Sequence, residues 1–160
     1  MSELKETPKE RVEIFLPSEG LVQLQLDLIS KLSEILADSE VEAVGAVAVP
    51  VAGRKELDIM VISENILKDT EILSQNGYKK GPIENEISYL KSFEGDIEVG
   101  VQIIPVGHKM IDIHRKIISR LRGNEDLRKT YEHFKLSLDG LGTEEYKQNK
   151  SLWIKEHLLL

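Results

Sequence analysis

Residues 41–62 constrain the fold of this chain more than any other stretch. Two apolar runs rich in β-branched residues, 41–49 and 57–62, flank a short segment of Pro, Gly and charged residues. Runs of this composition bounded by turn residues are typical of β-strands. We therefore expect two adjacent strands joined by a loop of about seven residues, with the rest of the chain packed around them.

This stretch also holds a candidate binding site. Gly45 lies inside the first run, where a glycine marks a close backbone approach or a bulge. Asp58 begins the second run, and an unpaired carboxylate is costly to bury. Arg54 and Lys55 precede it, so a glycine, a basic loop and an acid together indicate a site for phosphate and a metal ion. The alternative is that Asp58 pairs with Arg54 or Lys55 and only fixes the loop.

The composition excludes several classes of protein. A chain of 160 residues is expected to form one domain, and its net charge of −7 argues against general nucleic-acid binding. The absence of cysteine excludes disulfides and thiolate metal sites. No apolar run approaches the roughly 20 residues of a membrane span, and the N-terminus lacks the apolar region of a signal peptide. We expect a cytoplasmic protein without membrane contact.

The sheet is expected within residues 14–107, after a flexible N-terminus of residues 1–13. Ser18 is the expected N-cap of a helix that runs to about residue 37, and Ser63 that of a helix over 64–75. Asn76-Gly77 is a typical helix end, and Tyr78 begins an extended segment. Residues 87–93 and 97–106 predict a hairpin whose second strand alternates between apolar and polar residues, the polar face meeting a cleft or solvent.

Residues 108–160 are expected to be helical. Helices are predicted over 109–122, over 125–138 with Asn124 as N-cap, and from Thr143 onward. Together the elements predict a single α+β domain over 14–160, with a mixed sheet flanked by helices and a C-terminal helical bundle. A homodimer through an exposed hairpin strand or through the bundle is left open.

The sequence VGAVAVPVAGRKELDIMV resembles the signature of the GrpB-like family, in a divergent form. Ala46 and Val47 stand in place of the family's Ser and Thr, and Glu56 in place of a Pro. Two further stretches, residues 131–135 and 146–150, resemble the family's C-terminal Tyr-Lys motifs. The matching positions of the signature are Gly45, Ala48, Val49, Pro50, Lys55 and Asp58. The resemblance implies a nucleotidyltransferase-like fold.

Nucleotidyl transfer needs metal ions that bridge phosphate oxygens, and the fold usually supplies two carboxylates at positions i and i+2 of one strand. Here the i+2 partner of Asp58 is Met60, and the neighbouring strand offers Gly100 and Gln102 where the family tends to carry His-x-His. The acid set therefore looks incomplete. We predict Asp58 as the catalytic residue and a ligand of Mg²⁺, and five residues that bind nucleotide or phosphate: Gly45, Ala46, Arg54, Lys55 and Gln102.

The resulting functional hypothesis is a protein that binds a nucleotide or another phosphate-containing small molecule with weak or no catalysis. The alternative is an active Mg²⁺-dependent nucleotidyltransferase that uses Asp58. Asp96 and Glu98 have the i, i+2 spacing of a displaced metal pair, although an exposed, charged hairpin strand is the favoured explanation. A basic patch on the bundle is either a solvated helix face or an anion contact: Arg120, Arg122, Arg128 and Lys129. The histidines lack the spacing of a zinc site.

Overall fold

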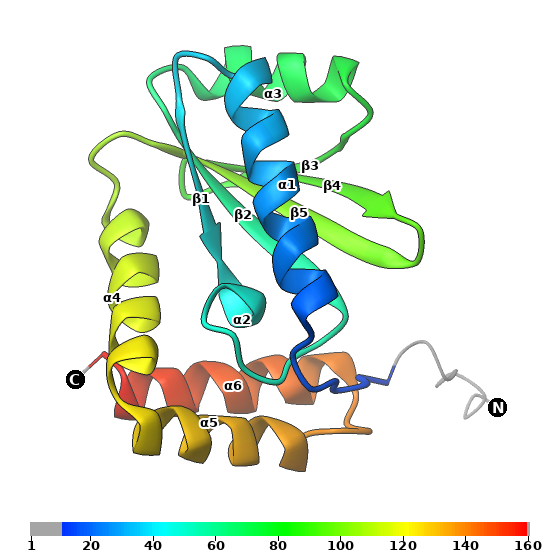
Figure 1. Cartoon of the computed structure of the whole chain (residues 1–160). Coiled ribbons are helices and arrows are strands. Elements are labelled where there is room, and N and C mark those ends of the chain that lie inside the picture. Colours follow the sequence, from blue (N-terminus) through cyan, green and yellow to red (C-terminus); the bar gives the residue numbers. More distant parts are fainter. Residues whose placement is uncertain (1–10, 160) are drawn as a thin grey trace, which may run out of the picture.

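The computed structural model describes residues 11–159, in which helices cover a five-stranded sheet (Figure 1). Eleven elements follow one another along the chain: α1 (Glu19–Ile35), β1 (Glu40–Val44), α2 (Gly45–Ala48), β2 (Glu56–Ser63), α3 (Ile66–Gln75), β3 (Lys79–Glu84), β4 (Ile87–Glu94), β5 (Ile97–Pro105), α4 (Lys109–Gly123), α5 (Glu125–Ser137) and α6 (Thr143–His157). The α+β class, the mixed sheet and the C-terminal helices agree with the prediction.

The strand order of the sheet is β1-β2-β5-β4-β3. Strands β2 and β5 are parallel, and the other neighbouring pairs are antiparallel. The predicted hairpin is confirmed as β4 and β5, which pair from Glu94 opposite Ile97 onward. The extended segment after Tyr78 forms the edge strand β3, which pairs with β4.

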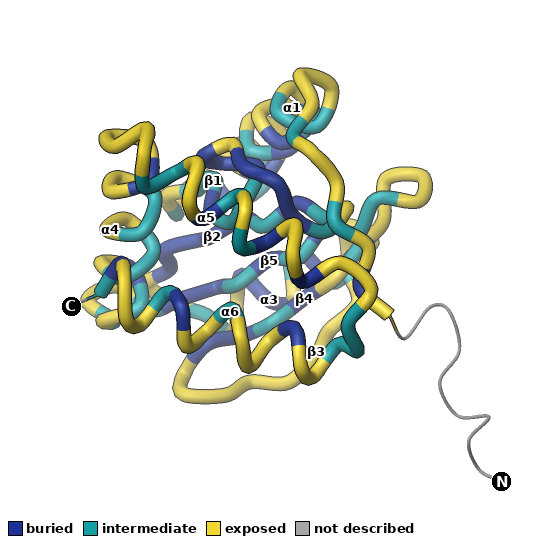
Figure 2. The backbone as a smooth tube through the Cα atoms, turned by 90° about the horizontal axis from the view of Figure 1, so that it is seen from below, coloured by how far each residue is buried: buried dark blue, intermediate teal, exposed yellow. Residues whose placement is uncertain are grey.

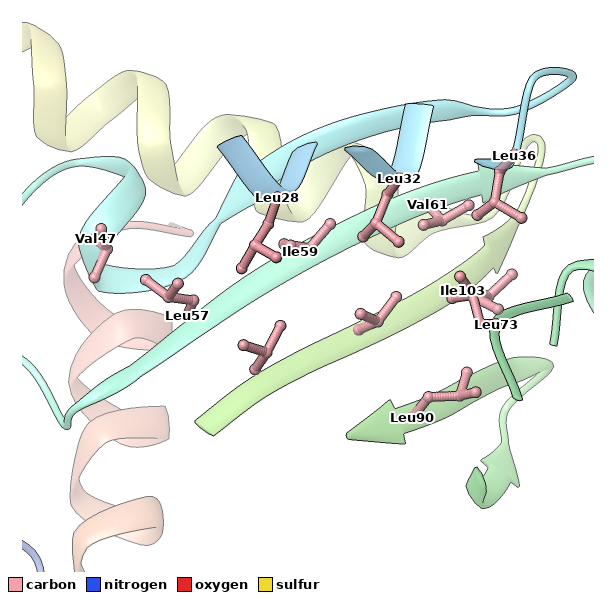
Figure 3. Packing of buried hydrophobic residues seen from close by; sticks show 12 residues of the cluster. Leu28, Leu32, Leu36, Val47, Leu57, Ile59, Val61, Leu73, Leu90 and Ile103 are labelled. Carbon is pink, nitrogen blue, oxygen red and sulfur yellow. The ribbon is translucent and has the colours of Figure 1, made fainter. Parts of the chain in front are cut away.

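One face of the sheet holds the largest core cluster. Leu28 and Leu32 of α1 and Leu73 of α3 pack on alternate residues of the central strands, such as Ile59 and Val101 (Figure 3). Leu32, Ile59 and Leu73 are fully shielded from solvent. Because strand residues alternate between faces, the residues between them point to the opposite face.

The opposite face is covered only in part. Met60, Ile62 and Ile104 pack with Ile111 of α4, at the end of the sheet where β2 and β5 finish. Helices α5 and α6 lie beyond the other end (Figure 1), joined by stacking of Tyr131 on Trp153. In Figure 2 the central strands are largely buried, whereas α4, α5 and α6 alternate between buried and exposed residues. The start of β2 therefore lies toward the end of the sheet near the bundle (Figure 1).

Helix caps bear out the sequence reading in two places and correct it in one. Ser18 and Asn124 cap α1 and α5 as predicted. Ser63 is the last residue of β2, and Asn65 caps α3 instead, with its side chain accepting a hydrogen bond from the Lys68 N–H. Asn65 is the N-cap because β2 continues through Ser63, so the helix begins later. The Ser63 hydroxyl accepts a hydrogen bond from Asn65 N.

The first predicted strand was too long. It ends at Val44, and the apolar residues after it form the short helix α2. Gly45 adopts φ +80°, a left-handed conformation that reverses the chain and that residues with a side chain rarely adopt. An apolar run alone does not separate a buried strand from a buried helical turn.

The expected flexible N-terminus lies mostly outside the described residues. Within its last part, Val12 is buried and its N–H donates to the Leu141 carbonyl at 2.8 Å. Among residues 11–159, no helix is both long and apolar enough to cross a lipid bilayer. The cytoplasmic location and the homodimer stay predictions.

Candidate functional site

Asp58 lies on the incompletely covered face of the sheet, near the start of β2. It pairs with Val44 of β1 on one side and with Gly100 of β5 on the other. A Cβ built on Gly45 would lie 2.4 Å from Asp58 Oδ2, and one built on Gly100 would lie 3.4 Å from Asp58 Oδ1. The two glycines therefore make room for the carboxylate, which explains why glycine follows β1 and why β5 carries a glycine opposite Asp58.

The backbone beneath this carboxylate is held in place by a buried amide. Gln25 of α1, which is 2% exposed, donates from Nε2 to the carbonyls of Val44 (3.2 Å) and Asp58 (2.8 Å). The amide thus ties together the two strand positions that flank the Gly45 turn. Gln25 is thus a polar residue on the buried face of α1 that fixes the geometry of the site.

The bundle side of the site is built from two Tyr-x-x-x-Lys pairs. Tyr131 and Lys135 stand one helical turn apart on α5, and Tyr146 and Lys150 on α6. Residues at this spacing share one face of a helix. Lys135 Nζ lies 5.3 Å from the centre of the Tyr131 ring and 5.9 Å from that of Tyr146, and Lys150 Nζ lies 5.7 Å from that of Tyr146. The two pairs converge on one place.

Lys135 is the most unusual residue of the site. Its side chain is 2% exposed, and its ammonium forms no ion pair or hydrogen bond with any described residue. The ammonium makes weak cation–π contacts with the rings of Tyr131 and Tyr146. A buried ammonium without acceptors is costly, so Lys135 holds its charge more readily when an anion enters the site.

Contacts from the bundle fix the segment between α2 and β2. Glu132 accepts a hydrogen bond from the Ala52 N–H at 2.7 Å, and Arg122 Nε donates to the Ala48 carbonyl at 3.0 Å. These bonds set the distance between the helical wall and the Gly45 turn. The other three residues of the predicted basic patch are engaged in similar structural contacts: Arg120 with Leu158, Arg128 with Leu121 and Lys129 with Glu125.

A cavity of about 190 Å³ separates the sheet from the bundle. Its polar lining combines an acidic side with a basic side: Glu56, Asp58, Gln102, His114, Lys135 and Lys150. Its apolar lining comes mainly from α4, with Ile117, Ile118 and Leu121, together with the backbone of Gly45 and Ala46. The cavity can therefore hold a molecule that has an apolar part and a charged part.

The charges in this cavity perturb one another. Burial, reinforced by the Glu56 carboxylate, raises the pKa of Asp58 to about 7. Burial, reinforced by Lys150, lowers the pKa of Lys135 to about 7. His114 Nε2 donates a hydrogen bond to the Gln102 amide oxygen at 3.0 Å, and burial lowers the pKa of His114. Perturbed ionisable groups gathered in one cleft are typical of functional sites.

Glu56 corrects the sequence analysis. It stands two residues before Asp58 on β2, so both carboxylates point to the same face of the sheet and both line the cavity. The prediction rests on the residue two positions after Asp58, and that residue, Met60, is fully buried in the second core cluster. The acid pair of this strand is therefore Glu56 and Asp58.

The other predicted residues divide into two groups. Gly45, Ala46 and Gln102 line the same cavity as Asp58. Arg54 and Lys55 do not line it: Arg54 lies 3.9 Å from Glu56, and Lys55 forms an ion pair with Asp96 at 2.8 Å. The cations nearest Asp58 come instead from the bundle, which the sequence analysis did not include in the site.

The two carboxylates of the alternative metal pair, Asp96 and Glu98, each face a lysine. Asp96 bonds Lys55, and Glu98 lies 3.6 Å from Lys91 Nζ. Across residues 11–159, no three His, Asp or Glu side chains gather so that they could hold a metal ion. A cation at this site would therefore depend on two carboxylates and on oxygens of its ligand.

Comparison with known proteins shows which family has this architecture. The GrpB protein family model matches residues 11–159. The chain belongs to the GrpB family. A UPF0157 protein of Vibrio cholerae is 28% identical over 134 residues, covering 80% of this chain and 70% of that protein. The GrpB crystal structure from Enterococcus faecalis has a TM-score of 0.70 at 21% identity, covering 89% of this chain and 98% of that one.

Solved structures of nucleotidyltransferases share this fold. The Cid1 poly(U) polymerase, in a structure with Mg and 3′-dATP bound, has a TM-score of 0.55 at 14% identity. The match covers 76% of this GrpB-family chain but only 41% of the polymerase. The likeness establishes the nucleotidyltransferase-like fold.

Proposed function

We propose that this GrpB-family protein binds a nucleotide or a related phosphate-containing small molecule in the cavity between the sheet and the bundle. The observation that carries the proposal is the Lys135 ammonium, 2% exposed and without a hydrogen-bond acceptor among the described residues. A phosphate group supplies several strong acceptors and negative charge, which together replace the lost hydration. Lys150 lines the same cavity and adds a second cation.

The acidic side of the cavity fits a magnesium ion. Mg²⁺ prefers oxygen ligands and is often held by one or two carboxylates together with substrate phosphates. Glu56 and Asp58 provide two carboxylates on one sheet face, and a cation between them and the ligand would relieve the repulsion that helps to raise the Asp58 pKa. When bound, Mg²⁺ would neutralise phosphate charge, while Lys135 and Lys150 orient the phosphates from the opposite wall.

Mg²⁺-dependent nucleotidyl transfer is the second candidate, and the Glu56–Asp58 pair favours it. The neighbouring strand, however, offers Gly100 and the Gln102 amide beside this pair, and Glu98 is engaged by Lys91. An amide bonded to His114 is a poorer ligand for a second metal ion than a carboxylate. We therefore propose binding with weak or no catalysis as the principal function.

A thermal-shift screen of the four ribonucleoside triphosphates, each with and without Mg²⁺, tests this function. A ligand that binds only the folded state raises the melting temperature. We expect at least one triphosphate to do so, more strongly with Mg²⁺, in the wild type and in Lys129→Met, and the rise to be smaller in Lys135→Met. Labelled triphosphates incubated with acceptor candidates separate binding from transfer, because turnover lost in Asp58→Asn would favour the enzyme.

A further inference from the structure

A row of paired residues leads from the cavity across the open face of the sheet. Asp58 of β2 pairs with Gly100 of β5, Gly100 pairs with Lys91 of β4, and Lys91 pairs with Lys79 of the edge strand β3. Directly paired residues point to the same face of a sheet. Asp58 and the two lysines therefore share one face, with a glycine that has no side chain between them.

A second cavity of about 360 Å³ lies over this row. Asp58 and Gln102 line both cavities, so the two spaces meet at these residues. The remaining lining includes Lys79, Lys80, Tyr89, Lys91, Glu98 and Gly100. Helices α1 and α3 pack on the opposite face and α4 packs further along the strands, which leaves this part of the sheet open.

The two lysines are exposed and face each other on neighbouring strands. Like charges directly opposite each other on neighbouring strands destabilise a sheet. Lys91 lies 3.6 Å from Glu98, but the Lys79 ammonium forms no ion pair within the described part of the chain. Two cations therefore lie together on one face of a protein whose net charge is −7, with Glu98 beside Lys91 as their acidic neighbour.

An aromatic ring stands beside the lysines. Tyr89 is half-buried, lines the second cavity and pairs with Gln102, so it lies on β4 on the same face as Lys91. A ring beside two cations is the combination that binds the base and the phosphate of a nucleotide, through stacking and charge. The acidic surface of the whole chain disfavours long nucleic acids, which need an extended basic footprint.

We propose that this second cavity is a separate site for a nucleoside phosphate, with its phosphate on Lys79 and Lys91 and its base against Tyr89. A ligand lying along the row would extend across Gly100 toward Asp58, at the border of the first cavity. The site goes beyond the function proposed above, because none of the residues that hold its phosphate or base lines the first cavity.

Titration of the full chain with 5′-AMP, followed by backbone amide NMR shifts, tests this site. We expect saturable shifts at Tyr89, Lys91 and Gly100. Removing two phosphate contacts in Lys79→Met/Lys91→Met should weaken the affinity about tenfold or more. The matched control Lys68→Met/Lys116→Met changes the net charge equally at exposed sites elsewhere and should bind as the wild type does. Equal affinity in the two double variants, or the absence of shifts, would overturn the proposal.

Two further ligands sharpen the test. Inorganic phosphate should bind more weakly than 5′-AMP, and Tyr89→Ala should remove that difference. A 5′-phosphorylated hexanucleotide that bound at these residues about tenfold more tightly than 5′-AMP would overturn the assignment to a small ligand. Failure of the first-cavity function is seen separately, as the absence of triphosphate-induced shifts at Ala46 and Lys150.

Discussion

The carboxylate of Asp58 lies directly against the backbone of Gly45, so that a Cβ on Gly45 would fall 2.4 Å from Asp58 Oδ2. Real Cβ atoms do not approach an oxygen so closely. The left-handed φ of Gly45 and the placement of Asp58 are therefore parts of one arrangement. Any side chain at position 45 must move the carboxylate or the turn.

Gly45→Ala should consequently cost about 2–4 kcal/mol of unfolding free energy, because backbone strain and a steric clash add. Gly77→Ala is the matched control. Gly77 has φ +94° but an added Cβ would meet nothing within 4 Å, so only the strain of about 1–2 kcal/mol applies. Urea denaturation measures both values, and equal costs would contradict the close approach.

Asp58→Asn should stabilise the ligand-free protein at alkaline pH. Burial raises the folded-state pKa of Asp58 to about 7, above its unfolded value of 3.8, so ionisation of this group destabilises the fold as the pH rises through that window. Since Asp58 keeps some contact with solvent, we expect a gain of about 1–2 kcal/mol at about pH 8.

The gain should vanish at about pH 4, where the folded wild type holds Asp58 protonated and the penalty is absent. Urea denaturation of wild type and variant across this range gives the comparison. A variant that is less stable than the wild type at both pH values would show that the ionised carboxylate is well solvated or well paired instead.

Trp153→Ala should destabilise the protein by about 3–5 kcal/mol, as expected for a buried aromatic residue. Trp153 is 8% exposed, and its ring lies 4.8 Å from Tyr131, 5.5 Å from Phe134 and 4.2 Å from His157, centre to centre. The neighbouring Leu152 is 56% exposed, so Leu152→Ala should change stability by about 0.5 kcal/mol or less. Chemical denaturation monitored by circular dichroism suits both variants. A similar cost in the two would place α6 at the periphery of the fold.

Sequence patterns predicted the sheet and the place of Asp58 in the site because both depend on local alternation. The i, i+2 spacing also applies before Asp58, but there Glu56 aligns with a proline of the family signature and is expected in the loop. The residue was missed because the end of the loop could not be located: the structure begins β2 at Glu56, one residue before the apolar run.

The basic side of the cavity could not be predicted from the sequence. Lys135 and Lys150 are far from Asp58 along the chain, and their approach depends on how α5 and α6 pack through Tyr131 and Trp153. One signal was available, namely two Tyr-x-x-x-Lys pairs on successive predicted helices. Closeness in sequence favours Arg54 and Lys55 as the cations of the site, whereas their side chains turn toward Glu56 and Asp96.

Calorimetric titration of the wild type, Lys135→Met and Lys129→Met with the triphosphate selected by the thermal-shift screen, in the presence of Mg²⁺, tests the central claim most directly. Lys129 lies on the same helix but is exposed and paired with Glu125, so it controls for charge. Because a charge-assisted hydrogen bond contributes about 1.5–3 kcal/mol, we predict about tenfold or weaker binding in Lys135→Met and wild-type affinity in Lys129→Met. Wild-type affinity in a folded Lys135→Met variant would contradict the account.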